Sequence, residues 1–324
     1  MQLQLRQSRD EIKGLAILWV VLFHAQLGLT GIAHQIQQIG YGGVDIFFFL
    51  TGFGLYYSLQ KSSDLRGYVQ RRILRLLPSY LPFCLLWLGV MLPLFNLSVV
   101  DSFRTIVGNL TMFGFWAGVP KVINWYVGAL VMALVIAPFA YALLSKGNKW
   151  TWCTLMIVAL AIGGCFIGDI RYMAVSRIPV FLIGMGMAKA NEVTTKRLMK
   201  ITPLALVLGI SILFYCFRFQ QDQLITYALY WHPFMLIAPA LCVVLAWVFS
   251  KLNRFTKYFA PLRMLGRASF EIFLCNVWVE VLGKKFGLAS TPTQWLIYSL
   301  VSVAIGVIYH ITITTIQSKC NTSR

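Results

Sequence analysis

Long apolar runs separated by short polar segments are the dominant pattern along the chain. A helix needs about 20 residues to cross a hydrocarbon core of ~30 Å. On that scale the pattern predicts spans at 14–33, 42–60, 76–97, 122–144, 150–168, 173–189, 201–218, 223–249, 264–284 and 291–316. A further run, 105–120, is short and broken by glycine, which predicts a re-entrant or interfacial segment. We therefore expect an all-α, polytopic membrane bundle of about ten helices, forming a single domain over residues 1–324 without an added soluble domain.

Composition and charge support this class. The chain is 59% hydrophobic and 12% charged, far from the averages of soluble domains. Most of its 28 basic residues fall in the segments that a cytoplasmic N-terminus would place inside. The positive-inside rule therefore predicts that both termini are cytoplasmic. The exceptions, in the predicted outer segments, are Arg104, Lys121, Arg171, Arg177, Arg218, Lys284 and Lys285.

The net charge of +18 does not indicate a nucleic-acid partner, because the cations lie in short loops between spans. We expect them to meet anionic lipid headgroups. The seven cysteines are scattered and mostly inside spans, and neither a C-x-x-C motif nor zinc-type spacing is present, so no metal is predicted. The first apolar run has no clear cleavage site, which predicts a retained span rather than a secretory signal.

The first candidate for chemistry is a histidine inside the first span. Lys13 is followed by ten residues and then His24, which places the imidazole roughly 16 Å along the helix, near mid-membrane. Ionisable side chains at that depth are costly and usually mark a functional site. The alternative is a histidine packed and satisfied between helices.

Asp45 is the candidate partner of this histidine. It is the only acid among the apolar residues of the first two spans, and a carboxylate can orient an imidazole and stabilise its protonated form. The two residues differ in depth by roughly 8 Å when each is counted along its own span. A helix N-cap at the membrane interface is the alternative role for Asp45.

Cations at the start of the third span form a second candidate site. Arg72 and Arg75 share a helix face, with Arg71 close by. Guanidinium groups there suit a multiply phosphorylated ligand such as coenzyme A, although simple cytoplasmic anchoring would also explain them.

Three further positions lie near predicted membrane boundaries. Trp125 and Tyr126 are expected at the outer interface, where aromatic residues are common and can also stack on sugar rings. Arg177 begins the sixth span at its outer end, and Glu271 lies in the ninth, where it can simply pair with a nearby cation.

The order and spacing of these motifs resemble acyltransferase family 3, membrane O-acyltransferases that modify bacterial surface glycans and some lipids. The resemblance covers nearly the whole chain. It rests on a basic residue ten positions before a histidine, G-V-D-x-F-F, R-x-x-R with a following proline, a W-aromatic segment, R-x-P-x-F and L-G-x-x-S-aromatic. The matching residues are Lys13, His24, Gly43 to Phe53, Arg72, Arg75, Pro78, Trp125, Tyr126, Pro138, Arg177, Pro179, Phe181, Leu265, Gly266, Ser269 and Phe270.

The chain departs from the family pattern at three positions. Lys13 stands where arginine is more frequent, so a phosphate contact there would be point-like rather than bidentate. Leu130 occupies a position that often carries glutamate, and Asn276 one that often carries histidine. The acid–base role would then fall more heavily on His24.

The resemblance implies transfer of an acyl group, with acetyl expected, from cytoplasmic acyl-CoA to a hydroxyl of an outer acceptor. Lys13, Arg71, Arg72 and Arg75 would bind the CoA phosphates, while His24 would act as general base or acyl carrier beside Asp45. The acceptor-side or supporting positions would be Trp125, Tyr126, Arg177, Ser269, Glu271 and Asn276.

The implied acceptor is a surface polysaccharide or its lipid-linked repeat unit, and the implied location is a bacterial inner or plasma membrane. Two other classes stay open at this point. A secondary transporter would also use many spans and polar residues at the midplane, although the chain has no evident internal repeat. A sensor or assembly partner could keep the fold without activity.

Overall fold

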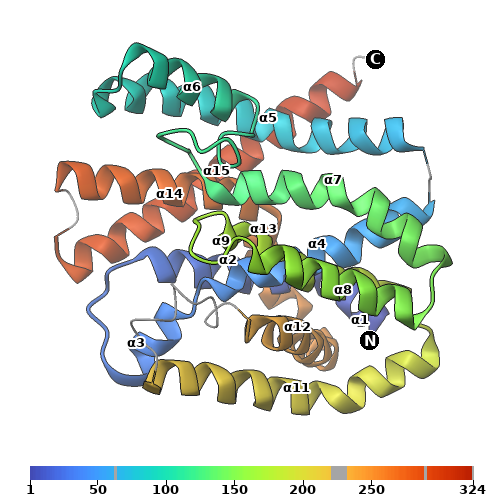
Figure 1. Cartoon of the computed structure of the whole chain (residues 1–324). Helices are drawn as coiled ribbons and strands as arrows, with labels where there is room; N and C mark the ends of the chain where they lie inside the picture. The colour runs from blue at the N-terminus through green and yellow to red at the C-terminus, as the bar shows by residue number, and fades with distance from the viewer. Residues whose placement is uncertain (62–63, 220–231, 288–289, 323–324) are drawn as a thin grey trace. The chain divides into compact units, whose positions relative to one another are not determined.

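The computed structural model describes residues 1–61, 64–219, 232–287 and 290–322. The structure is 84% helical, and its described residues contain no β-strand, which confirms the all-α prediction (Figure 1). The elements are α1 (Gln2–Gln7), α2 (Arg9–His24), α3 (Gly31–Gln38), α4 (Gly42–Lys61), α5 (Leu65–Met91), η1 (Leu92–Phe95), α6 (Val99–Leu110), α7 (Trp125–Lys146), α8 (Lys149–Gly164), α9 (Tyr172–Val175), α10 (Ile178–Lys189), α11 (Glu192–Phe219), α12 (Phe234–Lys251), η2 (Asn253–Phe259), α13 (Ala260–Arg267), α14 (Ser269–Phe286) and α15 (Pro292–Thr322).

Six helical segments in the described part of the chain are long and apolar enough to cross a membrane. They are Gly42–Lys61, Leu65–Phe95, Trp125–Lys146, Glu192–Phe219, Phe234–Lys251 and Pro292–Lys319. A multi-pass arrangement is therefore supported, while the predicted total of ten spans and the cytoplasmic termini stay predictions. Residues 223–231 of the eighth predicted span lie outside the described residues.

The other four predicted spans form shorter helices. The first ends at His24 instead of continuing to residue 33, and the backbone that follows has positive φ at Gly28 and Gly31, a conformation that interrupts a helix. α8 has 16 residues. The sixth is divided into α9 and α10, and the ninth into α13 and α14.

The chain divides into two compact units, and several helices run from one into the other. The first unit comprises 1–12, 44–68 and 129–256. Within it α4 and α10 meet backbone to backbone. A Cβ atom at Gly52 would lie 2.1 Å from the Phe181 carbonyl oxygen, and one at Gly184 would lie 2.2 Å from that of Phe49. Glycine is therefore required at both positions.

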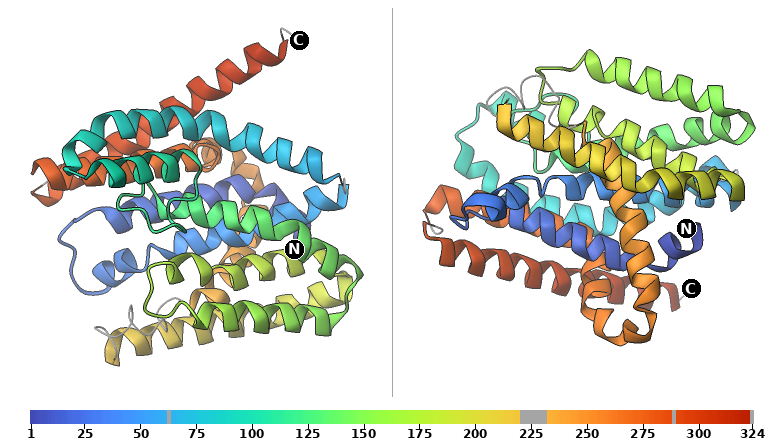
Figure 2. Two further views of the ribbon diagram at one scale, coloured as in Figure 1. Left: turned by 45° about the horizontal axis from the view of Figure 1, so that its top comes forward. Right: turned by 90° about the horizontal axis from the view of Figure 1, so that it is seen from below.

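The second unit comprises 13–43, 69–128 and 257–324. Its most extensive helix contact joins α14 to α15, which lie side by side in Figures 1 and 2. A Cβ atom at Gly306 would lie 2.5 Å from the Ile272 Cα atom, so only glycine permits this approach. A cluster of buried apolar side chains from α5, α14 and the start of α7 fills the interior of this unit, including Tyr80, Phe83, Trp87, Val127 and Leu274.

Candidate functional site

His24 is the last residue of α2 and pairs with a glutamate of α14. Its Nδ1 atom lies 2.6 Å from Oε2 of Glu280, and the two side chains are 25% and 17% exposed. Because an ionised carboxylate only accepts hydrogen bonds, Nδ1 carries the proton and Nε2 is the nitrogen available for proton transfer or acyl attachment.

The end of α2 is fixed by the segment that follows it. Gln37 of α3 donates from Nε2 to the Leu22 carbonyl at 2.8 Å and also bonds the Ala25 carbonyl, so it satisfies carbonyls that a helix terminus leaves unpaired. A Cβ at Gly40 would lie 2.5 Å from the Trp19 carbonyl oxygen, and one at Gly43 equally close to that of Ala16. These glycines let the returning chain lie directly on α2 and hold His24 in place.

Lys13 lies on the same face of α2 as His24. The eleven-residue separation corresponds to three helical turns, or about 16 Å along the axis. Lys13 is half-buried, and both residues belong to the second unit. The spacing in the sequence thus places a lysine and a histidine on one side of one helix.

Asp45 was expected to orient His24, and this stays a prediction. The carboxylate that contacts His24 within the second unit is that of Glu280. Asp45 belongs to the first unit, where its Oδ1 atom is 3.8 Å from Nε of Arg177 and both side chains are almost fully buried.

Arg177 was expected to have an acceptor-side or supporting role, and its side chain is only 1% exposed. Nη1 donates to the Met173 carbonyl at 2.5 Å and to Oγ of Ser176 at 2.9 Å. A guanidinium enclosed in this way, beside Asp45, holds the start of α10 against α4. The structure therefore favours a structural role for both residues.

The arginines of α5 share a face with a buried serine. Arg72, Arg75 and Ser79 are separated by three and four residues, which places them on one side of the helix. Arg71 and Arg75 are exposed, Arg72 is half-buried and Ser79 is buried. The guanidinium groups therefore lie on one face of α5, and Ser79, at the C-terminal end of that face, is buried in the interior of the unit.

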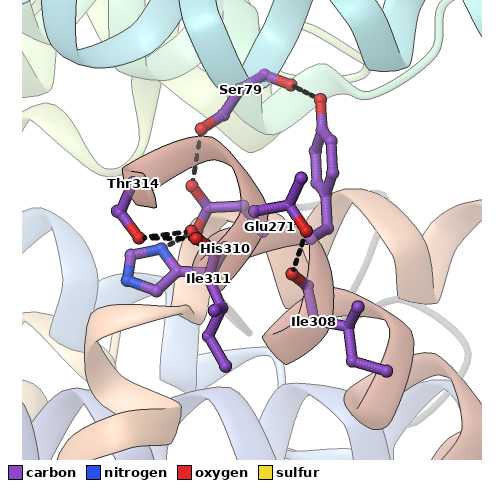
Figure 3. A network of polar contacts seen from close by, with 8 residues as sticks. Ser79, Glu271, Ile308, His310, Ile311 and Thr314 are labelled. Atoms are coloured by element: carbon purple, nitrogen blue, oxygen red, sulfur yellow. Dashed lines mark hydrogen bonds and ion pairs between the residues drawn. The ribbon is translucent and has the colours of Figure 1, made fainter. Parts of the chain in front are cut away.

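The anchor is a network that joins three helices (Figure 3). Ser79 of α5 donates from Oγ to Oε1 of Glu271 on α14 at 2.6 Å, and Oε2 of Glu271 lies 3.2 Å from Nδ1 of His310 on α15. The Tyr309 hydroxyl donates to the Ser79 carbonyl at 2.7 Å. Buried polar groups from three helices therefore contact one another, which links α5 and its arginines to α14. The partners of Glu271 are a serine and a histidine, and its supporting or acceptor-side role stays a prediction.

Asn276 lies between the two glutamates of α14. Its Oδ1 atom accepts a hydrogen bond from Oγ of Ser302 on α15 at 3.1 Å, and the residue is 5% exposed. Among the described residues its Nδ2 atom has no hydrogen-bond partner. Ser269 is also buried, at the first position of the same helix.

The aromatic pair that begins α7 was expected at the outer interface, in an acceptor-side or supporting role. Tyr126 is buried, with its ring 4.7 Å from that of Phe273 on α14, and Trp125 is half-buried. The reason is the preceding segment, in which buried Asn109 accepts a hydrogen bond from the Ile123 backbone and draws the start of α7 into the unit.

The residues missed by the sequence reasoning are Glu280, His310 and Ser79. The signal was present for the first two, because ionisable residues in membrane-length segments indicate function. No group of three histidine, cysteine, aspartate or glutamate side chains that could hold a metal occurs among the described residues.

Comparison with known proteins gives one match. No curated protein and no solved structure matches the chain. A family model described as an acyltransferase domain matches residues 8–311, nearly the whole length, and so includes both units, His24 and its glutamate partner. The chain belongs to acyltransferase family 3.

Proposed function

We propose that this protein is a membrane O-acyltransferase that moves an acetyl group from cytoplasmic acetyl-CoA to a hydroxyl of an acceptor outside the membrane. The observation that carries the proposal is the 2.6 Å contact between His24 and Glu280. It provides an imidazole with a defined proton position in a protein of an acyltransferase family. Acyl transfer to a hydroxyl requires such a base or carrier.

The proposed chemistry uses Nε2 of His24. As a base, it takes the proton of the acceptor hydroxyl while the hydroxyl oxygen attacks the thioester carbonyl carbon. The carbon–sulfur bond then breaks, and the same proton passes to the departing CoA sulfur. As a carrier, Nε2 attacks the thioester carbonyl carbon, the carbon–sulfur bond breaks and CoA leaves as its thiolate. The acceptor hydroxyl oxygen then attacks the acyl group on Nε2, the nitrogen–carbon bond breaks, and the hydroxyl proton passes to the CoA thiolate or to solvent. In both routes Glu280 holds the ring and balances the positive charge that forms on it.

The spacing of cations supports a donor that carries phosphates. Glu271 and Glu280 are nine residues apart, so the Ser79 contact lies about 13 Å along α14 from the His24 contact. Arg75 is four residues before Ser79, which adds about 6 Å. The arm of CoA between phosphate and sulfur, counted as extended backbone, spans about 15 Å. With the reach of the arginine side chain, phosphates at Arg72 and Arg75 are compatible with a thioester at His24.

We further propose a surface polysaccharide or its lipid-linked repeat unit as the acceptor, in a bacterial inner or plasma membrane. The family match and the six apolar helices support a membrane enzyme. The arginines on α5, together with Lys13, support the proposed binding of acyl-CoA on the cytoplasmic side.

The test uses purified protein in lipid nanodiscs with radiolabelled acetyl-CoA, comparing wild type with His24→Ala. CoA binding is measured in parallel for wild type, Arg72→Ala and Arg75→Ala. We expect label to leave CoA, or to become attached to protein, only when His24 is present, and CoA affinity to fall in both arginine variants.

The outcomes separate the alternatives. Label trapped on wild-type protein identifies the carrier route, and label found only on added acceptor membranes identifies the base route. A wild-type protein that does not bind CoA would overturn the proposal. An active His24→Ala variant would overturn the assigned role of the histidine.

A further inference from the structure

Asn276 presents a buried hydrogen-bond donor that nothing in the described part of the chain accepts. Its Oδ1 atom lies 3.1 Å from Oγ of Ser302, while Nδ2 has no partner among those residues. Burial of an unpaired amide N–H costs free energy. A side chain of this kind is suited to a ligand that brings a carbonyl oxygen.

The position of Asn276 along α14 indicates which carbonyl this is. It precedes Glu280 by four residues and so lies on the same face, about 6 Å along the axis from the level of His24. It lies on the side toward Glu271, and hence toward the arginines of α5. If acyl-CoA lies with its phosphates at the arginines and its thioester at His24, the part of its arm next to the thioester lies beside Asn276.

In the pantetheine arm of CoA, the amide carbonyl nearest the sulfur is separated from it by three chain atoms. An extended chain of that length covers about 5 Å, close to the offset between Asn276 and Glu280. An amide carbonyl that leaves water for a membrane-embedded path needs a donor there.

We propose that Nδ2 of Asn276 donates a hydrogen bond to this pantetheine carbonyl. Asn276 is then a residue of the second unit that binds acyl-CoA. The inference rests on the proposed use of acyl-CoA. It adds a contact that recognises the arm rather than the nucleotide, and it is separate from the phosphate contacts of Arg72 and Arg75.

The experiment compares two ligands on protein in nanodiscs by calorimetry. CoA contains the pantetheine arm, whereas adenosine 3′,5′-bisphosphate contains only the nucleotide part. We expect Asn276→Ala and the near-isosteric Asn276→Leu to weaken CoA binding about 3- to 10-fold, the loss of one hydrogen bond. Binding of the bisphosphate should stay unchanged. In both variants the Ser302 hydroxyl can donate to the Ser299 carbonyl instead, which limits the cost to folding.

The adjacent Cys275, also buried, is the matched control. It belongs to the apolar cluster between α5 and α14, so Cys275→Ala disturbs α14 without removing a donor and should leave CoA affinity unchanged. Wild-type affinity for CoA in both Asn276 variants would overturn the inference, as would an equal loss for both ligands. Failure of the wild type to bind CoA would instead overturn the proposed function.

Discussion

Replacing Glu280 by glutamine tests the catalytic proposal most directly, because it changes the partner of His24 with little change in volume. The carboxylate can only accept from Nδ1, and so it fixes the proton there. The amide of Glu280→Gln can also donate, which allows the proton to move to Nε2 and blocks the nitrogen that must act on the acceptor. The variant should therefore lower turnover without lowering donor affinity.

The magnitude follows from the contact itself. At 2.6 Å, with the two side chains 25% and 17% exposed, this is a partly shielded hydrogen bond to a charged group. Such bonds contribute about 1.5–3 kcal/mol. If the transition state loses that amount, the rate falls by about 10- to 150-fold, since 1.36 kcal/mol corresponds to a factor of ten.

The assay measures release of CoA thiol from acetyl-CoA by the enzyme in membranes that contain its acceptor. Glu280→Asp keeps a carboxylate on a shorter side chain and should retain more activity than Glu280→Gln. Glu271→Gln removes the other glutamate of α14 and should mainly affect donor affinity and stability. Turnover of Glu280→Gln equal to wild type, or a change confined to the donor KM, would refute the reasoning.

Three further predictions address the scaffold. Ser79→Ala should lower the Tm and raise the donor KM while turnover at saturating donor is kept, because the arginine face of α5 loses its anchor; kinetics and thermal unfolding check this. Gly43→Ala should lower stability by about 1–3 kcal/mol through a clash with a carbonyl of α2, whereas Gly89→Ala, with open space around it, should not. Hydrogen bonds from Arg171 hold the pKa of Asp169 at about 2, so Arg171→Ala should raise that pKa toward 3.8, measurable by carbon-13 NMR of labelled aspartate.

The sequence was sufficient to place Lys13 and His24 on one helix but not to find where that helix ends. The apolar run continues past His24, so hydropathy alone does not predict that the helix ends there. The break depends on the positive φ values at Gly28 and Gly31 and on the capping by Gln37. These are tertiary features, because the side chain that satisfies the terminus comes from the next helix.

The partner of His24 could not be derived for a related reason. Helical periodicity shows which residues share a face, but not which helix packs against that face. Asp45 was the only acid among the apolar residues of the first two predicted spans, and it was chosen for that reason. Glu280 is separated from His24 by more than 250 residues, and only packing brings the two together. Tyr126 is a similar case. Its place at a predicted boundary indicated a membrane interface, but the hydrogen bond from the Ile123 backbone to Asn109 draws the start of α7 inward and Tyr126 is buried.

The helix that was hardest to predict is the one that organises the candidate site. The span predicted at 264–284 holds several charges, and α14 is not among the helices apolar enough to cross a membrane on composition alone. Glu271, Asn276 and Glu280, together with Lys284 and Lys285, lower its hydropathy. The first three contact α5, α15 and α2 in turn. A helix kept polar inside an apolar unit loses stability unless each polar group has a partner. Glu271 and Glu280 have protein partners, whereas Nδ2 of Asn276 has none among the described residues. That unpaired amide is the feature of α14 that the proposed binding of acyl-CoA would explain.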